Sequence, residues 1–297
     1  MKFFLHWTEL SLALRIIPKL DIKGPNLVKG IHLEGLRVLG KPEEFAKYYY
    51  EQGADEIIFQ DVVASLYGRN SLHEIISNTA KEIFIPLTVG GGIRTIEDIS
   101  KILRAGADKI SINTAAHKNP KLINEASRVF GKSTIVVGIE AIRQPDGTYK
   151  AFIDNGRNKT GREVTSWARQ VEELGAGEIL LTSVDQEGTG NGADIELIRL
   201  VRNKINIPLI VHGGIGNSDQ AVGVVLESKK ISGIAISSML HYQYISKNRK
   251  IEGFEDEGNI EFLKSNRLNS RITPTSLSEL KEKLYENKIN CRFAKPK

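Results

Sequence analysis

Short apolar runs alternate along most of the chain with stretches that have the periodicity of amphipathic helices. The runs are nearly continuous in Val, Ile and Leu, which is typical of strands buried on both faces of a parallel sheet. Helix-start signals lie between them, such as Thr95 with acids in the following turn, and the capping-box pair Ser276 and Glu279. The pattern predicts strands at residues 15–21, 56–61, 85–89, 109–112, 134–140, 178–183, 207–212 and 233–237.

One unit of this pattern occurs twice. The segment IPLTVGGGI at Ile85 returns as IPLIVHGGI at Ile207, and GADEII at Gly53 returns as GAGEIL at Gly175, both at an offset of 122 residues. Eight strand–helix units, four in each copy, predict an α/β fold: a (βα)8 TIM-type barrel built from two similar half-barrels. An open doubly wound sheet is the alternative, but it explains the duplication less well.

We expect a single barrel domain at residues 15–297, preceded by an N-terminal extension at residues 1–14. Two polar stretches interrupt the pattern of strands and helices. Residues 146–160 are interpreted as a hairpin-like excursion after the fifth strand. Residues 243–273 are interpreted as an insertion before the last helix, either a mobile loop or an element that docks a partner or covers the site.

The composition is typical of a globular protein, with 40% hydrophobic and 26% charged residues. The net charge of +5 comes from scattered Lys and Arg residues, which suits an acidic or phosphorylated ligand better than a nucleic acid. The lone Cys291 allows no intrachain disulfide, and the histidines lack metal-binding spacing, so we expect a cytoplasmic protein without a metal or other cofactor. No apolar run reaches the length of a membrane span.

The repeated strands end in glycines, at 90–92 in one copy and at 213–214 in the other. The strand after each repeat ends in polar residues, Asn113 and Thr114 in the first half and Ser238 in the second. Glycines between a buried strand and a helix bring backbone N–H groups close to a phosphate. Tight turns without a ligand are the alternative for one cluster, but two clusters predict two phosphates at opposite ends of one ligand.

Two carboxylates, Asp21 and Glu140, occupy equivalent strand ends in the two halves. Because function in such a barrel lies at these ends, they are candidates for a facing acid–base pair, with capping or salt bridging as the alternative. Asp61 and Thr182 end two further strands and are expected at the same mouth. Lys29 is a candidate phosphate or loop cation, or an exposed surface lysine.

The opposite end of the barrel has its own pattern of charges. Arg15, Glu56, Lys109 and Glu178 stand at or near four strand starts. Such alternating charges are expected to form a ring that closes the base. The ring is either a set of structural salt bridges or a gate for a small molecule.

Several segments together resemble one known family, the cyclase subunit of imidazole glycerol phosphate synthase. They are RIIPKLDIKG, VKG, GADEIIFQD, TVGGGI, GADKISINTAA, KTG, GAGEILLTSVDQEGT and SSMLH. The resemblance covers residues 15–242 and the last helix. It implies a two-half (βα)8 barrel that takes ammonia from a partner glutaminase in a heterodimer. The family converts a bis-phosphorylated ribulosyl formimino carboxamide nucleotide (PRFAR) to imidazole glycerol phosphate and the carboxamide nucleotide AICAR, a lyase step of histidine biosynthesis.

The resemblance also implies roles for single residues. Asp21 matches the catalytic acid of the first strand, Glu140 matches the acid of the fifth strand, and Lys29 matches the lysine of a mobile loop. The four charges at the base match the gate through which ammonia enters the barrel, above a docked glutaminase. The phosphate sites match two groups of residues, and with the strand-end candidates the predicted substrate-binding set is Lys29, Asp61, Gly92, Asn113, Thr114, Thr182, Gly188, Gly214 and Ser238.

Three residues depart from the family pattern. Glu140 and Glu187 stand where the family has Asp, and His212 stands where a serine is common. A displacement of about 1 Å in a catalytic group can cost roughly 100-fold in rate. Two alternatives therefore stay open: a paralogue that supplies ammonia-dependent amidine formation on a bacterial surface sugar, and a non-catalytic phosphate-binding subunit that activates a glutaminase. The related isomerase of the same pathway fits less well, because it needs no ammonia.

Overall fold

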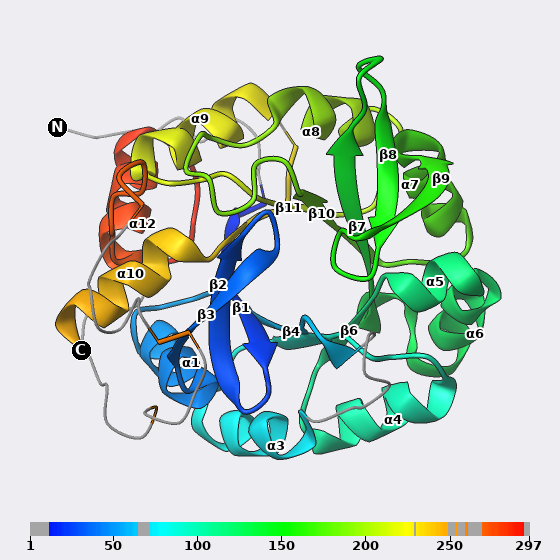
Figure 1. The fold of residues 1–297 in the computed structure, drawn as a ribbon, viewed down its shortest axis with the longest axis horizontal. Coiled ribbons are helices and arrows are strands. Elements are labelled where there is room, and N and C mark those ends of the chain that lie inside the picture. The colour runs from blue at the N-terminus through cyan, green and yellow to red at the C-terminus, as the bar shows by residue number, and fades with distance from the viewer. Residues whose placement is uncertain are drawn as a thin grey trace, which may run out of the picture.

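The computed structural model describes residues 12–64, 72–228, 230–248, 254, 259–260 and 269–293. Within these ranges, eight parallel strands close into a barrel, because β10 pairs with β7 and β12 pairs with β1 (Figure 1). The predicted (βα)8 barrel is therefore confirmed. In order around the barrel, the strands are β1 (Arg15–Lys23), β4 (Ile57–Asp61), β5 (Leu87–Gly90), β6 (Lys109–Ile112), β7 (Ile135–Arg143), β10 (Glu178–Ser183), β11 (Leu209–His212) and β12 (Gly233–Ile236).

Helices surround the barrel and cover its outer face (Figure 1). The two predicted start signals are confirmed as capping boxes, with Thr95 and Asp98 at the start of α4 and Ser276 and Glu279 at the start of α12. The helices are α1 (Pro42–Glu51), α3 (His73–Glu82), α4 (Ile96–Ala105), α5 (Thr114–Lys118), α6 (Lys121–Phe130), α7 (Val164–Glu173), α8 (Ile195–Arg202), α9 (Ser218–Ser228), α10 (Ser238–Lys247) and α12 (Leu277–Glu286), with a short 3-10 turn, η1, at Lys132–Thr134.

The two halves repeat their backbone contacts at the sequence offset. The Ile57 N–H donates to the carbonyl oxygen of Pro86 over 2.9 Å, and the Ile179 N–H donates to that of Pro208 over 3.0 Å. Both β5 and β11 begin directly after these prolines, two residues later than predicted. Proline has no N–H to give to a ladder, which explains the later start.

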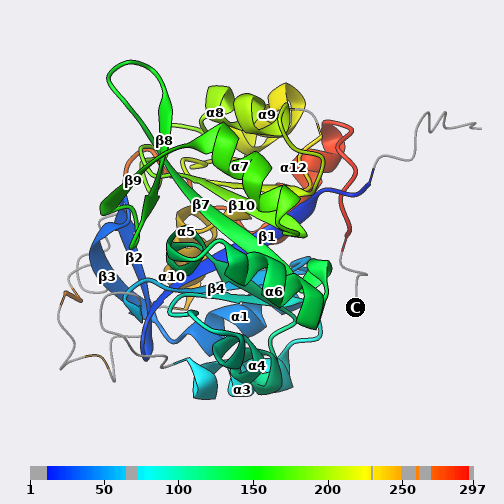
Figure 2. The ribbon, with the colours of Figure 1, turned by 90° about the vertical axis from the view of Figure 1, so that its right-hand side faces the viewer.

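Two antiparallel hairpins extend the sheet beyond the barrel. The predicted excursion at 146–160 is confirmed as β8 (Tyr149–Ile153) and β9 (Asn158–Glu163), which continue from the end of β7. The pair β2 (Asn26–Ile31) and β3 (Glu34–Gly40), which continues from β1, was not predicted. Both hairpins lie at the end of the barrel where β1 and β7 finish (Figure 2).

The barrel interior is layered. Lys19 and Asp21 lie on the same face of β1 as Ile17, successively nearer the mouth, because side chains alternate along a strand. All three are buried. Polar and charged groups therefore lie above one apolar layer, whose members are Ile17, Ile58, Val136, Leu180, Ile210 and Ala235.

The predicted insertion at 243–273 begins inside a helix, because α10 continues to Lys247. Most of residues 249–268, and residues 1–11 of the predicted extension, lie outside the described residues. The far end of the insertion packs on the loop after β10, where the side-chain amide of Asn269 donates to the carbonyl oxygens of Gly188 over 3.2 Å and Thr189 over 3.1 Å. Within the described ranges, no helix combines the length and apolar character needed to cross a membrane.

Candidate active site

The C-terminal ends of β4, β5, β6 and β7 surround a cavity of about 210 Å³. It is lined by five residues predicted for the site: Asp61, Gly92, Asn113, Thr114 and Glu140. Thr114 begins α5, and Asn113 before it has φ −121° and ψ −80°. The Asn113 side-chain oxygen is buried and has no hydrogen-bond partner among the described residues. The cavity therefore combines an open helix start with polar side chains, an arrangement that suits an anion.

The second half builds a matching but nearly filled pocket of about 10 Å³. Its lining includes the predicted residues Gly188, Gly214 and Ser238. Ser238 begins α10, and Ser237 before it has φ −120° and ψ −87°, close to the angles of Asn113. The two predicted phosphate sites therefore share a backbone geometry and differ in free space.

A buried network of charged side chains borders this second pocket. Glu187 and His212 line the pocket, and Lys29 lies behind Glu187. Lys29 forms an ion pair with Glu187, and its Nζ lies 3.9 Å from Asp21 Oδ2. His212 Nε2 lies 3.7 Å from Glu187 Oε1. Although burial opposes the effect, the charge of Lys29 and the nearby His212 ring hold the pKa of Glu187 well below its usual value. Lys29 is thus neither a loop residue nor a surface lysine: it lies in β2 and is buried.

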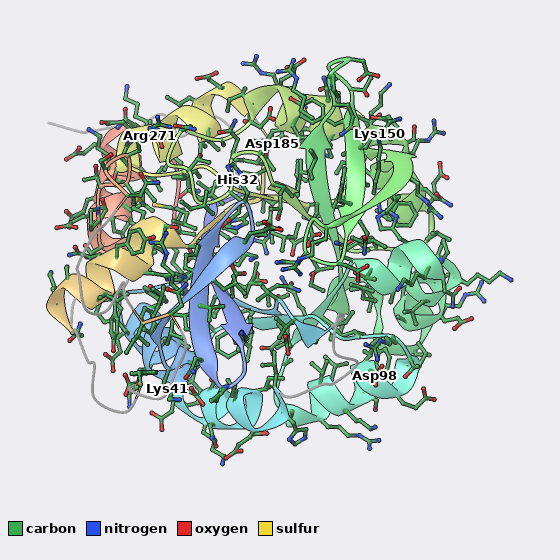
Figure 3. All side chains as sticks on the ribbon, in the orientation of Figure 1. His32, Lys41, Asp98, Lys150, Asp185 and Arg271 are labelled. Atoms are coloured by element: carbon green, nitrogen blue, oxygen red, sulfur yellow. The ribbon has the colours of Figure 1, made fainter. Side chains whose placement is uncertain are left out.

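The β2–β3 hairpin lies across the mouth because of contacts at its tip. The His32 N–H donates to the carbonyl oxygen of Glu187 over 2.9 Å, and the Leu33 N–H donates to its carboxylate over 3.3 Å. The side-chain amide of Asn155, in the β8–β9 turn, donates to the Leu33 carbonyl oxygen over 3.0 Å. His32 Nδ1 lies 3.0 Å from the carbonyl oxygen of Val184, next to Asp185 in the loop after β10 (Figure 3). The two hairpins therefore meet above the barrel.

Asp21 is buried and faces two cations. The Lys19 ammonium donates to Asp21 Oδ1, and Lys29 faces the other carboxylate oxygen. Sequence reasoning missed Lys19, although a signal was present. A lysine two residues before Asp21 in an apolar strand must share its face, and so must enter the barrel.

Glu140 extends from β7 into the first cavity. The Gly156 N–H, from the β8–β9 turn, donates to Glu140 Oε2 over 2.7 Å. Burial raises the pKa of Glu140 to about 7, against the opposing effects of the Gly156 N–H and the charge of Lys19. Part of the side chain still faces the cavity. A carboxyl group with this pKa can hold or release a proton near neutral pH.

A third cavity, of about 30 Å³, lies beside Glu140 and reaches deeper into the barrel than the 210 Å³ cavity. Lys19, Ser111 and the predicted residue Thr182 line it with Glu140, and Leu180 from the apolar layer forms part of its wall. The cavity thus extends from Glu140 at the mouth to the apolar layer below. A space of this size holds one or two molecules as small as water.

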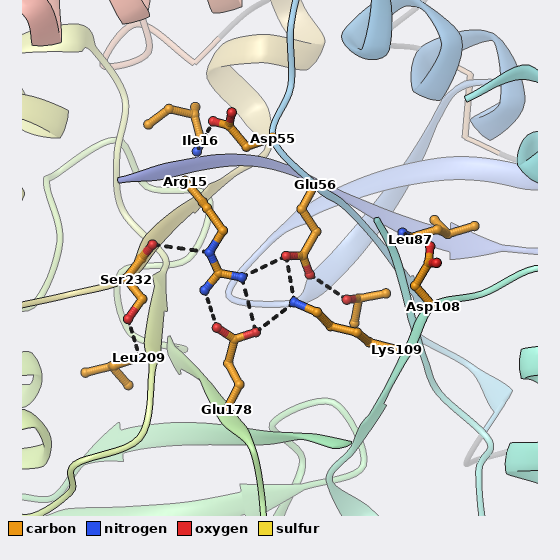
Figure 4. A network of polar contacts seen from close by, with 11 residues as sticks. Arg15, Ile16, Asp55, Glu56, Leu87, Asp108, Lys109, Glu178, Leu209 and Ser232 are labelled. Carbon is orange, nitrogen blue, oxygen red and sulfur yellow. Dashed lines mark hydrogen bonds and ion pairs between the residues drawn. The ribbon is translucent and has the colours of Figure 1, made fainter. Parts of the chain in front are cut away.

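The four charges predicted at the base form a closed ring (Figure 4). Arg15 Nη1 lies 2.8 Å from Glu56 Oε2, and Lys109 Nζ lies 2.9 Å from the same oxygen. On the other side, Glu178 forms an ion pair with Arg15 and lies 3.2 Å from Lys109 Nζ. Two acids and two bases therefore alternate around the axis, directly below the apolar layer.

Comparison with known proteins decides the family. A family model described as "Histidine biosynthesis protein" matches residues 15–246. The chain belongs to this family. It is also similar to curated proteins named "Imidazole glycerol phosphate synthase subunit HisF". That of Legionella pneumophila is 57% identical over 206 residues, covering 69% of this chain and 97% of the relative. Those of Alkaliphilus metalliredigens and Methanopyrus kandleri are 44% and 45% identical, each covering 78% of this chain and 92% of the relative.

The name of these relatives describes one subunit of a synthase, and this chain is a member of the HisF family. All the residues predicted from the sequence lie in the mouth or in the ring, although their roles stay predictions. Sequence reasoning missed two contributors to the mouth besides Lys19. Asn155 and Gly156 come from a turn whose sequence, DNG, indicates only a tight reversal and not where it lies.

Proposed function

We propose that this HisF family member is the ammonia-dependent cyclase subunit that converts PRFAR to imidazole glycerol phosphate and AICAR. The proposal rests mainly on the two equivalent pockets at the strand ends, one beside the start of α5 and one beside the start of α10. Asp21 and Glu140 lie between them. A ligand with one phosphate at each end matches this arrangement. Lys29, Asp61, Gly92, Asn113, Thr114, Thr182, Gly188, Gly214 and Ser238 then bind substrate.

The route for ammonia is the barrel axis. In this proposal, ammonia released by a glutaminase partner enters through the ring of Arg15, Glu56, Lys109 and Glu178. It passes the apolar layer and reaches the small cavity below Glu140. Neutral ammonia crosses an apolar layer far more readily than ammonium, because burial of an unpaired charge is very costly. The ring, with both of its cations paired to acids, is a gate whose ion pairs must separate for each passage.

The two acids divide the proton transfers. Asp21 serves in closing the imidazole ring, and Glu140 serves in releasing the carboxamide. Glu140 has a pKa of about 7, raised by burial, which suits a group that gives a proton to a leaving nitrogen near neutral pH.

The test is direct. Purified chain is given PRFAR and ammonium chloride, without a glutaminase, and product formation is followed by chromatography. We expect imidazole glycerol phosphate and AICAR in equal amounts, and Asp21→Asn as the matched inactive control. A correctly folded protein that forms neither product contradicts the proposal.

A second candidate is ammonia-dependent amidine formation on a surface sugar, and the specific observation for it is Glu140 in place of the family's Asp. The variant Glu140→Asp separates the candidates. If the parent is silent and this variant gains PRFAR turnover, the chain has moved to another substrate or to a non-catalytic role. If the parent is already active, the first proposal stands.

A further inference from the structure

Lys19 lies between the two acids, inside the barrel. Only 4% of the residue is exposed. It projects above the apolar layer from the same face of β1 as Asp21, and it lines the small cavity beside Glu140. Burying a lysine is costly unless its charge is paired. The buried position of Lys19 therefore indicates a functional role.

The surroundings of the two acids differ because of this lysine. Asp21 has an ammonium at each oxygen, since Lys19 donates to Oδ1 and Lys29 lies 3.9 Å from Oδ2. Glu140 accepts the Gly156 N–H and forms no ion pair among the described residues. Its charged environment consists of Lys19, which favours the carboxylate, and Asp154, which opposes it.

The main chain of Lys19 is anchored by two side chains, those of Ser237 and His241. Its carbonyl oxygen accepts the Ser237 hydroxyl over 2.7 Å and His241 Nε2 over 3.1 Å. The Tyr49 hydroxyl lies 2.7 Å from His241 Nδ1. Burial and the charge of Lys29 lower the pKa of His241 to about 3, so the ring is neutral and donates through one nitrogen while it accepts through the other.

This anchor lies where β1 changes neighbours. β1 pairs with β12 as far as Pro18 and with β4 from Lys19 onward. The carbonyl group of Lys19 is thus held by side chains from the junction of β12 and α10, which also begins the second phosphate pocket. Fixing the main chain at this point fixes the direction in which the Lys19 ammonium reaches Asp21.

We propose that Lys19 is a positioning residue that assigns the roles of the acid pair: it holds Asp21 as the carboxylate and leaves Glu140 to carry the proton. The inference rests on the proposed cyclase function. The nitrogen that ammonia supplies replaces the ketone oxygen of PRFAR, which leaves as water. As this nitrogen then bonds to the formimino carbon and closes the ring, Asp21 accepts a proton from it. As the bond from the formimino carbon to the AICAR amino nitrogen breaks, Glu140 donates its proton to that departing nitrogen. Both groups then return to their starting states by exchange with solvent.

The test compares Lys19→Met, which keeps the length of the side chain but not its charge, with Lys19→Arg. For each, kcat/KM for PRFAR is measured across pH at a constant concentration of free ammonia. We expect Lys19→Met to lose roughly 10- to 100-fold. We also expect the fall of kcat/KM at alkaline pH, its alkaline limb, to move to higher pH in this variant. The missing cation no longer favours ionisation of Glu140, so Glu140 keeps its proton to a higher pH. Lys19→Arg retains the limb of the parent. A uniform loss with an unmoved limb would mean a merely structural role and overturn the inference.

A second measurement needs neither turnover nor a folded Lys19 variant. Infrared difference spectra of the free parent, against Glu140→Gln, are recorded while pH is varied. We expect a protonated carboxyl band below about pH 7 in the parent that Glu140→Gln lacks. Its absence overturns the inference. If the band is present but the parent forms no product from PRFAR and ammonia, the proposed function fails and the assignment of the proton stands.

Discussion

The two halves of the barrel have similar backbone angles and different side chains at the two proposed phosphate pockets. The residues before α5 and α10 share unusual angles, and the pockets beside them measure about 210 Å³ and about 10 Å³. In the first half, the cavity is open and lined by Glu140 and Asn113. In the second, Glu187, His212 and Ile272 occupy the corresponding space.

This difference shows which part of the duplicated unit is constrained. The glycines and helix starts proposed to bind phosphate recur in both halves, which is expected if backbone N–H groups make the contact. The side chains around them have diverged. One half has an open cavity beside Glu140, and the other holds the β2–β3 hairpin across the mouth through Glu187 and Lys29.

The largest expected effect concerns the acids at equivalent strand ends. We expect Asp21→Asn and Glu140→Gln each to lower kcat for PRFAR by roughly 10²- to 10⁴-fold, because each removes one proton transfer. Steady-state assays with saturating ammonium measure this. If either variant keeps the rate of the parent, the two halves do not share the chemistry.

The sequence was sufficient for the barrel, the two-half repeat and the charged ring, because each depends on local periodicity or on residues fixed at strand ends. It was not sufficient for the mouth. The β2–β3 hairpin is held by Glu187 and His32, which lie far apart in the chain, and the donor to Glu140 comes from a turn that folds back from β8. Contacts of this kind follow from tertiary placement, which periodicity does not encode.

The second effect tests the contacts between the β2–β3 hairpin and Glu187, here called the hairpin latch. We expect Glu187→Gln to lower the free energy of unfolding by about 3 kcal/mol, because it removes the nearer of the two acids that pair with the buried Lys29 ammonium and leaves it with Asp21 at 3.9 Å. Urea denaturation measures this. Glu82→Gln is the matched control, since it breaks an exposed pair with Lys47 and should change stability little. Equal effects of the two variants would show that the latch contributes nothing particular.

The third prediction uses the glycines that the halves share. Gly91 and Gly213 have φ of +99° and +106°, and a Cβ at either would meet the carbonyl oxygen of Asp61 or Ser183. We expect Gly91→Ala and Gly213→Ala to destabilise the fold by similar amounts, about 1–3 kcal/mol from backbone strain alone. Thermal unfolding compares them. A large effect in only one half would mean that the backbones are less equivalent than their angles indicate.

The smallest effect is a pH dependence confined to the first half. Burial raises the pKa of Glu140 from its ordinary value of 4.5 to about 7. Its contribution to stability is therefore fully present below 4.5 and is lost as pH rises through about 7. We expect a loss of roughly 2 kcal/mol relative to Glu140→Gln over this range, allowing for partial exposure. The free energy of unfolding is measured against pH for both proteins. A constant difference between the parent and Glu140→Gln at all pH values would contradict the assigned pKa.

The central claim is that one bis-phosphorylated ligand spans both halves. Calorimetric titration with PRFAR, in the absence of ammonia, tests it most directly, with ribose 5-phosphate as the single-phosphate comparison. We predict one PRFAR per chain, bound at least about 100-fold more tightly than ribose 5-phosphate, because the second phosphate binds without a further loss of translational freedom. Two PRFAR molecules per chain, or equal affinities for the two ligands, would contradict the account.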